Sequence, residues 1–550
     1  MSLYLPPELK EKGKAEFEQA VGRGLTRRDF MKGLAAAGAA LPLTAAMYYG
    51  YTKLHGDPIK VGLIGAGDEG GVLVGEHNPE YLEFVAYSDI RPSNQKRIFE
   101  GEPTGPRKGF NKIYGEKAKK IQFHRDYHDL LERKDIDAVV IALPLHLHAP
   151  VAIDALKKGK HVLCEKLMAW NVQQCKKMIQ AAEKYDRILA IGHQRHYSML
   201  YAHALEVVKS GDLGDIKHIR ALWHRNNAWP LLDEKGNPKL DAQGRPRFRD
   251  GWQPDIKDED RLSPEDLLKF GKFKSMEELV RWRLYNETGG GLMAELGSHQ
   301  LDACSIFLGK VHPLAVTGVG GKYFYHDDRQ IEDHVFVTFE FPGRNYYQGE
   351  EGEALRVKQE RGEIKDQHDK VIVTYSSIST NTLEPYGECV MGSRASLLVE
   401  NEATVMLIPE RNPNAALLSA KPTTLSVTTT GAGKPAIDSS ASTGALSPAD
   451  AQAKGQQSLG TGPVSRGYRE EMEHFAYCVK MWNQGASKTD RPIPRCDGQA
   501  AMADAIIALT ANLAMRNQKR YTFDPQWFDY KKTDLVPDME TTPRYVIEEI

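Results

Sequence analysis

The segment Gly62-Leu63-Ile64-Gly65-Ala66-Gly67-Asp68-Glu69-Gly70 places the spacing GxGxxG directly after an apolar run and directly before a helix-forming stretch. In such a strand-turn-helix unit the first glycine allows a tight turn, the second lets the backbone approach a ligand, and the third lets the helix pack closely on the strand. The free N–H groups of the helix N-terminus then suit a phosphate. We therefore predict a pyrophosphate site formed by Gly65, Ala66, Gly67, Asp68, Glu69 and Gly70.

An acidic residue at the end of the next predicted strand completes a dinucleotide-binding motif. Asp89 follows the glycines by about 20 residues, where a carboxylate accepts hydrogen bonds from the adenosine ribose. This position favours NAD. Arg91, two residues later, is a candidate partner for the 2′-phosphate of NADP, so NADP remains the alternative.

Short β-branched runs alternate with amphipathic segments from Pro58 onward, which is typical of βαβ units around a parallel sheet. We predict strands at residues 59–64, 84–88, 121–123, 138–142, 161–164 and 188–191, and helices at 151–158 and 172–185. The fold class is α/β, with an N-terminal Rossmann NAD(P)-binding domain over residues 57–192.

The remainder of the chain, residues 193–550, predicts a second α/β domain with a mostly antiparallel sheet. Strands are expected at residues 216–223, 334–341, 371–375, 386–391, 396–399 and 404–408, and helices at 201–209, 468–482 and 498–516. Two inserts interrupt this domain, at 231–261 and 412–465. Bulky residues alternate on both faces of strand 334–341, so a homo-oligomer, a dimer or a tetramer, is expected.

Composition excludes several classes of function. The 550 residues include 72 Lys and Arg against 74 Asp and Glu, a net charge of -2 that gives no general attraction to nucleic acid. The six cysteines are scattered without a CxxC pair, which indicates neither a zinc knuckle nor a disulfide scaffold.

Residues 1–56 predict an export signal and linker. Thr26-Arg27-Arg28-Asp29-Phe30-Met31-Lys32 precedes an uncharged, Ala- and Gly-rich stretch at 33–52, the pattern of a twin-arginine signal. The twin-arginine translocase would then be a partner during export, to the periplasm or an equivalent compartment. If the signal is not cleaved, the stretch is expected to act as an N-terminal membrane anchor. Because this route carries folded proteins, a cofactor bound before export is expected.

Two later segments resemble motifs of the Gfo/Idh/MocA oxidoreductases. They are Cys164-Glu165-Lys166-Leu167 and Gly289-Gly290-Gly291-Leu292-Met293-Ala294-Glu295-Leu296-Gly297-Ser298-His299-Gln300-Leu301-Asp302. The resemblance extends from about residue 59 to the C-terminus and includes His193-Gln194-Arg195 and Arg495-Cys496-Asp497-Gly498. It implies a Rossmann domain joined to an α/β domain with an open, mostly antiparallel sheet, in which residues 193–550 bind substrate and mediate oligomerisation. It also implies oxidation of sugars, cyclitols or related polyols with NAD or NADP.

The resemblance also implies catalytic roles for Lys166, His299 and Glu295. Lys166 matches the lysine of the family's Glu-Lys-Pro motif, with Leu167 in place of proline, and its ammonium would stabilise negative charge on a substrate oxygen. His299 is expected to be the general base. Glu295 stands four residues earlier, where the family has aspartate, and on a regular helix it would orient the imidazole or a substrate hydroxyl. Ligand type alone also allows a metal at Glu295, His299 and Asp302, but no second ligand cluster supports it, and we predict none.

Further residues are expected around the cofactor and the substrate. Leu143-Pro144-Leu145-His146-Leu147-His148 stands where the family's Thr-Pro-x-x-x-His pattern lines the nicotinamide ribose, and Pro144 and His148 match it. Glu165 belongs to the same predicted cofactor site. A sugar or polyol pocket is expected from Arg195, Trp223, His224, Arg283, Tyr285, His299 and Asp302.

Three functions are compatible with these motifs. The first is an exported NAD(P)-dependent dehydrogenase whose cofactor stays tightly bound, because the periplasm has no replenished nicotinamide pool. The second is a glycoside-cleaving enzyme that oxidises a ring carbon, eliminates the aglycone and reduces the product with the recycled NAD, without the usual pair of carboxylates. The third is a non-catalytic sugar-binding protein of the same fold.

Overall fold

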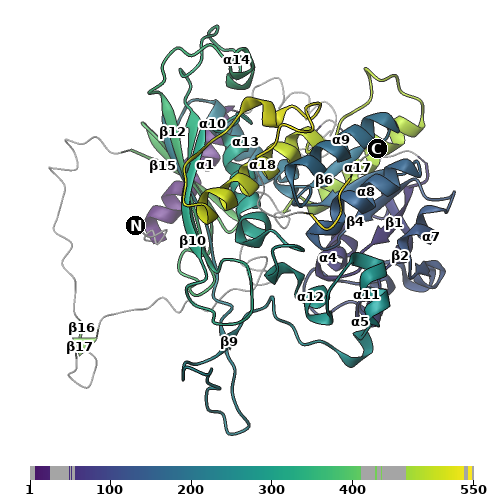
Figure 1. The fold of residues 1–550 in the computed structure, drawn as a ribbon. Coiled ribbons are helices and arrows are strands. Elements are labelled where there is room, and N and C mark those ends of the chain that lie inside the picture. Colours follow the sequence, from purple (N-terminus) through teal and green to yellow (C-terminus); the bar gives the residue numbers. More distant parts are fainter. Residues whose placement is uncertain are drawn as a thin grey trace.

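The computed structural model describes residues 7–24, 49, 51, 56–410, 428–429, 435–436, 466–537, 543–547 and 550. Within this part the chain forms a six-stranded and an eight-stranded sheet (Figure 1). The predicted twin-arginine signal at 26–32, nearly all of the stretch 33–52 and most of the insert 412–465 lie outside the described residues. No helix in the described ranges is both long and apolar enough to cross a membrane.

The first sheet is the predicted Rossmann sheet. Its order is β3-β2-β1-β4-β5-β6, and every neighbouring pair is parallel. Nearly every residue of its central strands is buried, as expected for a sheet with helices on both faces. Its strands are β1 (Ile59–Ile64), β2 (Leu82–Ser88), β3 (Gln122–His124), β4 (Ala138–Ile141), β5 (His161–Glu165) and β6 (Leu189–Gly192). The helices that join them are α4 (Asp68–Glu76), α5 (Pro92–Glu100), α6 (Phe110–Tyr114), α7 (Tyr127–Leu131), α8 (His148–Lys157) and α9 (Val172–Lys184).

The second sheet has the order β15-β14-β13-β7-β12-β11-β10-β18 and is antiparallel except between β7 and β12. The predicted fold class is thereby confirmed. Two strands, β10 and β18, were not predicted: the sequence of β10, AVTGVGG, is rich in glycine, and β18 has only two residues. The strands are β7 (Ile216–His224), β10 (Ala315–Gly321), β11 (His334–Pro342), β12 (Lys370–Ile378), β13 (Tyr386–Gly392), β14 (Ala395–Glu400), β15 (Thr404–Pro409) and β18 (Tyr521–Thr522).

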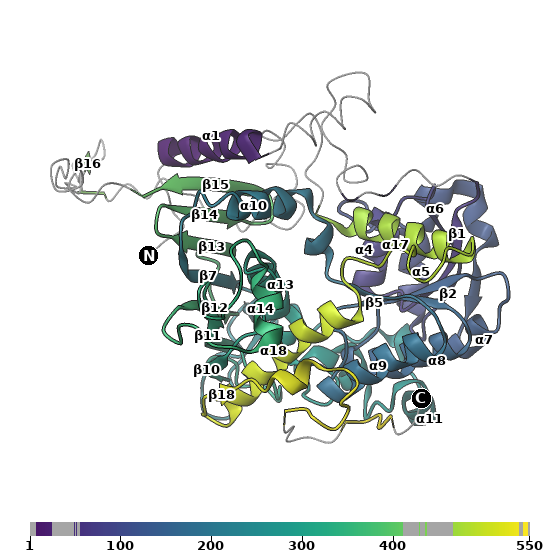
Figure 2. The ribbon, with the colours of Figure 1, turned by 90° about the horizontal axis from the view of Figure 1, so that it is seen from above.

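Helices cover one face of the second sheet. Helices α10 (Met199–Lys209), α13 (Ser298–Phe307) and α18 (Gly498–Arg516) lie between this sheet and the Rossmann domain (Figure 2). The other face leaves large apolar side chains in solvent: Val319 is 63% exposed and Phe336 is 47% exposed. One side of this sheet is therefore uncovered within the described chain. Other short elements in this half of the chain are helix α14 (Leu355–Arg361) and two small strand pairs. The pairs are β8 (Trp229–Pro230) with β9 (Phe248–Arg249), and β16 (Thr428–Thr429) with β17 (Pro435–Ala436).

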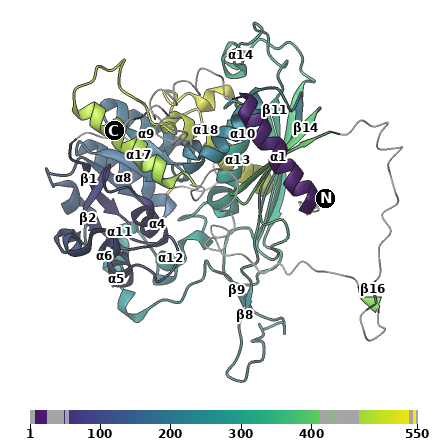
Figure 3. The same ribbon diagram turned by 180° about the vertical axis from the view of Figure 1, so that it is seen from behind.

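Two helices depart from the predicted domain division. Helix α17 (Tyr468–Asn483) lies within the range 193–550 assigned to the second domain, but its Met472, Phe475 and Val479 pack in the core that contains β1 and β2. The chain thus returns to the Rossmann domain after the second insert. Helix α1 (Pro7–Gly24) lies within the predicted signal and linker, yet it packs along β15, with Phe17 buried (Figure 3).

The insert 231–261 has two parts. Residues 231–247 form an exposed loop beyond β8 and β9 (Figure 1). Residues 250–260 turn back toward the Rossmann domain and lead into α11 (Pro264–Gly271) and α12 (Met276–Val280). We call residues 250–282 the strap. Its Asp266 pairs with Arg125 of the Rossmann domain at 2.7 Å, so the strap joins the two domains beside the carboxyl ends of the parallel strands.

Candidate active site

One cavity of about 820 Å³ lies between the Rossmann domain, the strap and α13. It extends from the glycine loop to the helix that carries His299, so the predicted cofactor and catalytic residues meet in one space. Of the predicted residues, those that line it are Gly65, Gly67, Asp68, Glu69, Asp89, Arg91, Pro144, His148, Glu165, Lys166, Trp223, Arg283, Glu295 and His299.

The glycine loop has the geometry that a pyrophosphate requires. Gly65 has φ of +96°, and a Cβ there would lie 2.2 Å from the carbonyl oxygen of Ala142. A Cβ on Gly70 would lie 2.1 Å from the Gly65 carbonyl oxygen, so this glycine lets α4 pack against the turn. In contrast, a Cβ on Gly67 meets no atom nearer than 4.0 Å. The backbone of Gly67 is therefore open to the cavity at the N-terminus of α4, and the loop fits a bound dinucleotide.

Asp89 lines the part of the cavity where the adenosine ribose is expected. Its carboxylate accepts hydrogen bonds from the backbone N–H of Ala66 at 2.8 Å and of Arg91 at 2.7 Å, and from Asn94 Nδ2 at 3.2 Å. Burial raises the pKa of Asp89, while these hydrogen bonds act in the opposite direction. Asn94 Nδ2 also contacts the other carboxylate oxygen of Asp89 at 3.4 Å. Asp68 instead faces Arg97 at 2.7 Å.

Lys166 follows β5 at the opposite end of the cavity, and its peptide bond to Leu167 is cis. Its Nζ donates to the backbone carbonyl of Glu295 at 2.7 Å, which ties the ammonium to the segment preceding α13. Burial lowers the pKa of Lys166, and the carboxylates of Glu295 and Glu165 oppose that shift. His148 connects the same region to the loop after β4, because its two ring nitrogens lie 2.8 Å from the carbonyl oxygens of Leu167 and Leu143.

Glu165 is buried beneath this end of the cavity. Its carboxylate accepts from the backbone N–H of Lys166 at 3.1 Å, and a Cβ on Gly192 would lie 2.9 Å from it. Burial, reinforced by the charge of Glu69, raises the pKa of Glu165 well above its ordinary value. A residue with a side chain at position 192 would displace Glu165.

His299 faces the cavity from the first turn of α13, with 8% of its surface exposed and its ring 5.6 Å from that of Trp223. No hydrogen bond from the described residues reaches either of its ring nitrogens. Burial, with the positive charge of Lys166 next in size, holds the pKa of His299 well below 6.5. The imidazole is therefore neutral at pH 7 and able to accept a proton.

Glu295 reaches the cavity but makes no hydrogen bond to His299, so the expected orientation of the imidazole by Glu295 is wrong, whereas its alternative role toward a substrate hydroxyl stays a prediction. Residues Met293–Gly297 form a π-helical turn, so the α-helical spacing rule does not apply between positions 295 and 299. The carboxylate of Glu295 instead accepts from Arg283 Nε at 2.7 Å. Burial alone would raise the pKa of Glu295, but Arg283 and Lys166 outweigh it and lower the pKa. Glu295 therefore stays ionised and positions Arg283 at the cavity wall.

Four residues predicted for the sugar pocket lie outside the cavity. Arg195 is buried, 1% exposed, and pairs with Glu402 at 2.6 Å. Asp302 is also 1% exposed and faces away from the cavity, toward His196 at 2.8 Å. Tyr285 does not line the cavity either. Arg195 and Asp302 are both outside the cavity because each pairs with a group of opposite charge in the interior, Arg195 with Glu402 and Asp302 with Lys310. His224, which bonds Ser376 at 2.8 Å, is likewise outside the cavity.

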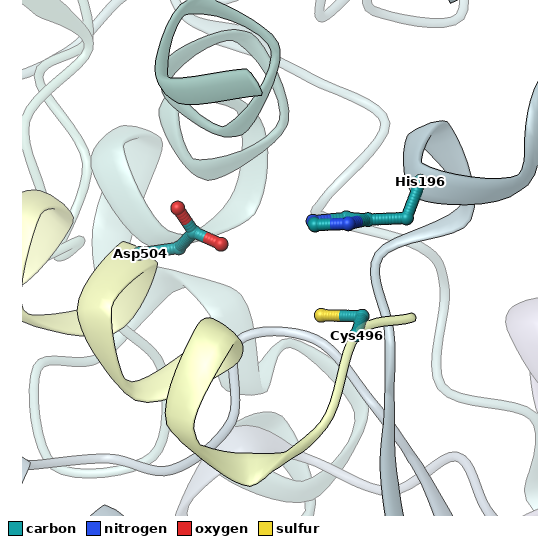
Figure 4. Close-up of side chains that lie close together, drawn as sticks. All are labelled: His196, Cys496 and Asp504. Atoms are coloured by element: carbon teal, nitrogen blue, oxygen red, sulfur yellow. The ribbon is translucent and has the colours of Figure 1, made fainter. Parts of the chain in front are cut away.

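Asp302 belongs to a buried cluster behind α13. The ligand atoms of His196, Cys496 and Asp504 lie within 4.8 Å of one another (Figure 4). Those of His193, Asp302 and Asp504 also lie within 4.8 Å of one another. Lys310 Nζ contacts Asp302 at 2.6 Å and Asp504 at 3.1 Å. Its ammonium already supplies the positive charge that the two carboxylates need, so a metal ion would have to displace it. The cluster therefore explains the burial of Asp302 without a ligand.

Several cavity residues were not predicted. Arg466 and Tyr468 enter from the segment after the second insert, and Trp252, Phe273 and Trp282 enter from the strap. Arg466 is held by Glu402, whose carboxylate accepts from its Nε at 3.0 Å. These residues follow inserts and irregular segments, where neither periodicity nor a motif gives a signal.

The chain carries domains of a known oxidoreductase family. Residues 59–193 match the model described as "Oxidoreductase family, NAD-binding Rossmann fold", and residues 269–350 match the "GFO/IDH/MocA C-terminal domain". The two matches contain the glycine loop, Lys166 and His299. The predicted resemblance is therefore confirmed at the level of both domains.

Similar proteins agree with this assignment. A glycosyl hydrolase family 109 protein of Shewanella pealeana is 28% identical over 226 residues, 38% of this chain and 48% of that protein. An inositol 2-dehydrogenase of Salmonella typhimurium is 37% identical over 92 residues, 16% of this chain and 27% of that protein. These matches cover half or less of each relative. The crystal structure of an aldose-aldose oxidoreductase from Caulobacter crescentus has the same fold, with a TM-score of 0.51, 15% identity, and coverage of 85% of this chain and 100% of that chain.

Proposed function

We propose that this chain, with its GFO/IDH/MocA-type NAD-binding and C-terminal domains, is an exported NAD(P)-dependent oxidoreductase that acts on a hydroxyl of a sugar or polyol. The observation that carries the proposal is the single cavity that joins the glycine loop and Asp89 to Lys166 and His299. When bound, the nicotinamide supplies the acceptor for a hydride from the substrate carbon. The chain must supply the proton transfer and the charge stabilisation.

His299 acts as the general base in this proposal. Its imidazole is neutral and faces the cavity, so it can take the hydroxyl proton and return it in the reverse direction. The ring of Trp223, 5.6 Å away, forms an apolar wall beside it. Such a wall keeps the imidazole from being protonated by bulk water.

Lys166 provides the opposite charge. Its ammonium is anchored through the Glu295 carbonyl and faces the same cavity, where it stabilises negative charge on the substrate oxygen. Arg283, held at 2.7 Å by Glu295, is suited to hydrogen-bond a neighbouring sugar hydroxyl. Base, cation and arginine then surround one secondary alcohol.

Tight retention of the cofactor is consistent with the strap. In an exported enzyme the oxidised and reduced forms must interconvert within the same site, because no pool replaces a lost cofactor. The strap lines the cavity with Trp252, Phe273 and Leu279 and is tied to the Rossmann domain by the pair of Arg125 and Asp266. Release of a dinucleotide would require this strap to open.

A redox-assisted glycoside-cleaving enzyme is the second candidate. The matches to glycosyl hydrolase family 109 proteins favour it, because 38% of this chain aligns with each of two such proteins, at 28% and 26% identity. His299 would serve the same purpose, taking the proton of the hydroxyl that is oxidised before the aglycone leaves. The two candidates differ in product: a net glycoside hydrolase returns its cofactor in every turnover and releases an aglycone.

Self-association through the uncovered face of the second sheet is part of the proposal. Val319 and Phe336 are exposed there on adjacent antiparallel strands, and an apolar patch of this kind suits a second copy of the chain. A dimer or a tetramer is expected in solution.

The first experiment is identification of the resident nucleotide. The full chain is purified without added nucleotide and denatured, and the released cofactor is quantified by mass spectrometry; we expect NAD or NADP near one per chain. Lys166→Ala and His299→Ala are each expected to abolish turnover of sugars or polyols while the nucleotide content stays unchanged. A chain that holds no nucleotide and binds neither would leave a non-catalytic sugar-binding protein. Loss of nucleotide from both variants would contradict the assigned roles.

A further inference from the structure

Asp89 directly follows β2, and α5 begins with Pro92 and Ser93. A 2′-phosphate of NADP would be held at this junction. It offers three donors suited to a phosphate: the guanidinium of Arg91, the hydroxyl of Ser93 and the backbone N–H of Ser93 in the first turn of α5. In the sequence, Arg91 is the reason that NADP remains the alternative to NAD as the cofactor.

In the structure a carboxylate from the other domain already occupies all three donors. Asp260, at the end of the strap's 3-10 turn Asp258–Asp260, accepts from Arg91 Nη2 at 2.9 Å and Nε at 3.1 Å. It also accepts from Ser93 Oγ at 2.7 Å and from the backbone N–H of Ser93 at 2.8 Å. Asp260 has 0% of its surface exposed, so it does not exchange these partners with water.

The carboxylate is ionised in this setting. Burial alone would raise the pKa of Asp260, but the hydrogen bonds from Ser93 and the charge of Arg91 outweigh it and lower the pKa. A permanent negative charge therefore lies directly behind Arg91. A phosphate brought to the same donors would lose their hydrogen bonds and meet a like charge.

The remaining arginines that the Rossmann domain contributes to the cavity are also paired. Arg97 contacts Asp68 at 2.7 Å, Arg107 contacts Glu102 at 2.8 Å, and Arg125 contacts Asp266 at 2.7 Å. Each positive charge along this wall is matched by a carboxylate, which suits an uncharged ribose and opposes a phosphate dianion.

We infer that Asp260 of the strap makes the site specific for NAD by occupying, from the second domain, the donors that a 2′-phosphate would need. The inference rests on the proposed function, since it requires that the cavity binds a dinucleotide. It assigns the selectivity to two carboxylates from different domains: Asp89 accepts from the ribose, and Asp260 removes Arg91 from the ligand. Asp260 is thus a specificity-determining residue that positions Arg91 and does not itself line the cavity.

The test compares the NADP to NAD ratio bound by the full chain after equilibration with equal concentrations of both, measured by mass spectrometry of the released nucleotide. Wild type is expected to hold NAD. Asp260→Asn keeps the shape but frees the charge of Arg91, and we expect the ratio to rise by about tenfold to a hundredfold, the worth of one hydrogen bond to a charged group. Asp260→Glu retains the charge and should retain the preference for NAD.

Two further variants separate this role from a loss of structure. Asp258→Asn changes a carboxylate in the same turn that pairs only with exposed Arg261, and it should leave the ratio unchanged. Asp260→Asn combined with Arg91→Ala should lose the gain in NADP, because the freed guanidinium is the cause of it. Thermal unfolding of each variant confirms that it is folded.

The results distinguish the two proposals. A wild type that holds NAD while Asp260→Asn keeps the wild-type ratio overturns the inference and leaves the proposed function standing. A wild type that holds NADP also overturns the inference alone. A folded wild type that binds neither nucleotide overturns the proposed function, and the inference with it.

Discussion

Arg195→Met tests whether the buried arginine after β6 stabilises the fold or binds substrate. The Arg195 guanidinium donates from Nε to Glu402 at 2.8 Å and from Nη1 to Gln300 at 2.7 Å, and it lies 3.7 Å from Glu388. Both carboxylates are essentially buried. Methionine fills much of the same space without the charge, so the change removes the ion pair and leaves the packing nearly intact.

The expected loss in the free energy of unfolding depends on which carboxylates are left without a cation. Removing one member of a buried ion pair costs about 3 to 5 kcal/mol, because the partner charge is left in the interior. Glu402 keeps Arg466, whereas Glu388 keeps only the hydroxyl of Tyr201. With an m-value of about 3 kcal/mol/M, the urea midpoint falls by about 1 to 1.7 M.

The loss is also expected to depend on pH. Burial raises the pKa of Glu388 to about 7, and Arg195 is the largest influence that opposes this rise. Without Arg195 the folded-state pKa rises further above its unfolded value of about 4.5, so the folded variant binds more protons than the unfolded one. Its stability then falls as the pH rises through this range, and the deficit relative to wild type is larger at pH 8 than at pH 6.

Urea unfolding followed by tryptophan fluorescence measures the cost, and steady-state kinetics on the folded variant measures KM. The matched control is Arg361→Met, which breaks a solvent-screened surface pair with Glu353 and should leave the urea midpoint close to that of wild type. Adding Glu388→Gln to Arg195→Met should recover part of the loss, because it removes the carboxylate that is left without a cation and can still accept from Tyr201. A variant of unchanged stability whose KM for sugar rises at least tenfold would refute the reasoning and return Arg195 to the substrate site.

Two further predictions concern the site itself. The pKa of His299 lies well below 6.5 and that of Lys166 lies below 10.5. A plot of kcat/KM against pH should therefore be flat near neutrality, fall only below pH 6.5, and fall again at an alkaline pH below 10.5. An acid limb centred above pH 6.5 would contradict a buried neutral base. Gly70→Ala should abolish nucleotide binding in a titration of NADH fluorescence, because its Cβ would lie 2.1 Å from the Gly65 carbonyl oxygen. Equal affinity of Gly70→Ala and wild type would show that the turn does not hold the nucleotide.

The elements that the sequence predicts well are those governed by local rules. The strands of the Rossmann sheet are short β-branched runs with helices on both faces, so their burial needs no long-range information. The glycine spacing 65, 67 and 70 likewise reflects contacts within one turn. Strand β10 was not predicted for the opposite reason: its glycines carry no strand signal, and only pairing with β11 places it in the sheet.

The contact predicted between Glu295 and His299 assumed the regular spacing of an α-helix, which the chain does not follow there. Glu295 and His299 stand four residues apart, but the π-helical turn Met293–Gly297 separates their directions, so Glu295 meets Arg283 and not the imidazole. A π-turn leaves no composition signature, because any good helix former can adopt it. The shared cavity of the two residues was predictable, but their contact was not.

Charged residues near a motif divide into two groups once their partners are known. Arg91 and Arg195 were both assigned to ligands, yet each pairs with a buried carboxylate far along the chain, 169 residues away for Asp260 and 207 for Glu402. Lys166 and His299 differ: the lysine is anchored by a backbone carbonyl and keeps its charge unmatched by a direct carboxylate bond, and no described residue bonds the imidazole. Since a buried charge requires a partner, a charged side chain at a cavity wall is free for a ligand only if no protein group of opposite charge reaches it. This difference supports the proposed roles of Lys166 and His299, and Arg91 becomes free for a phosphate only when Asp260 is removed.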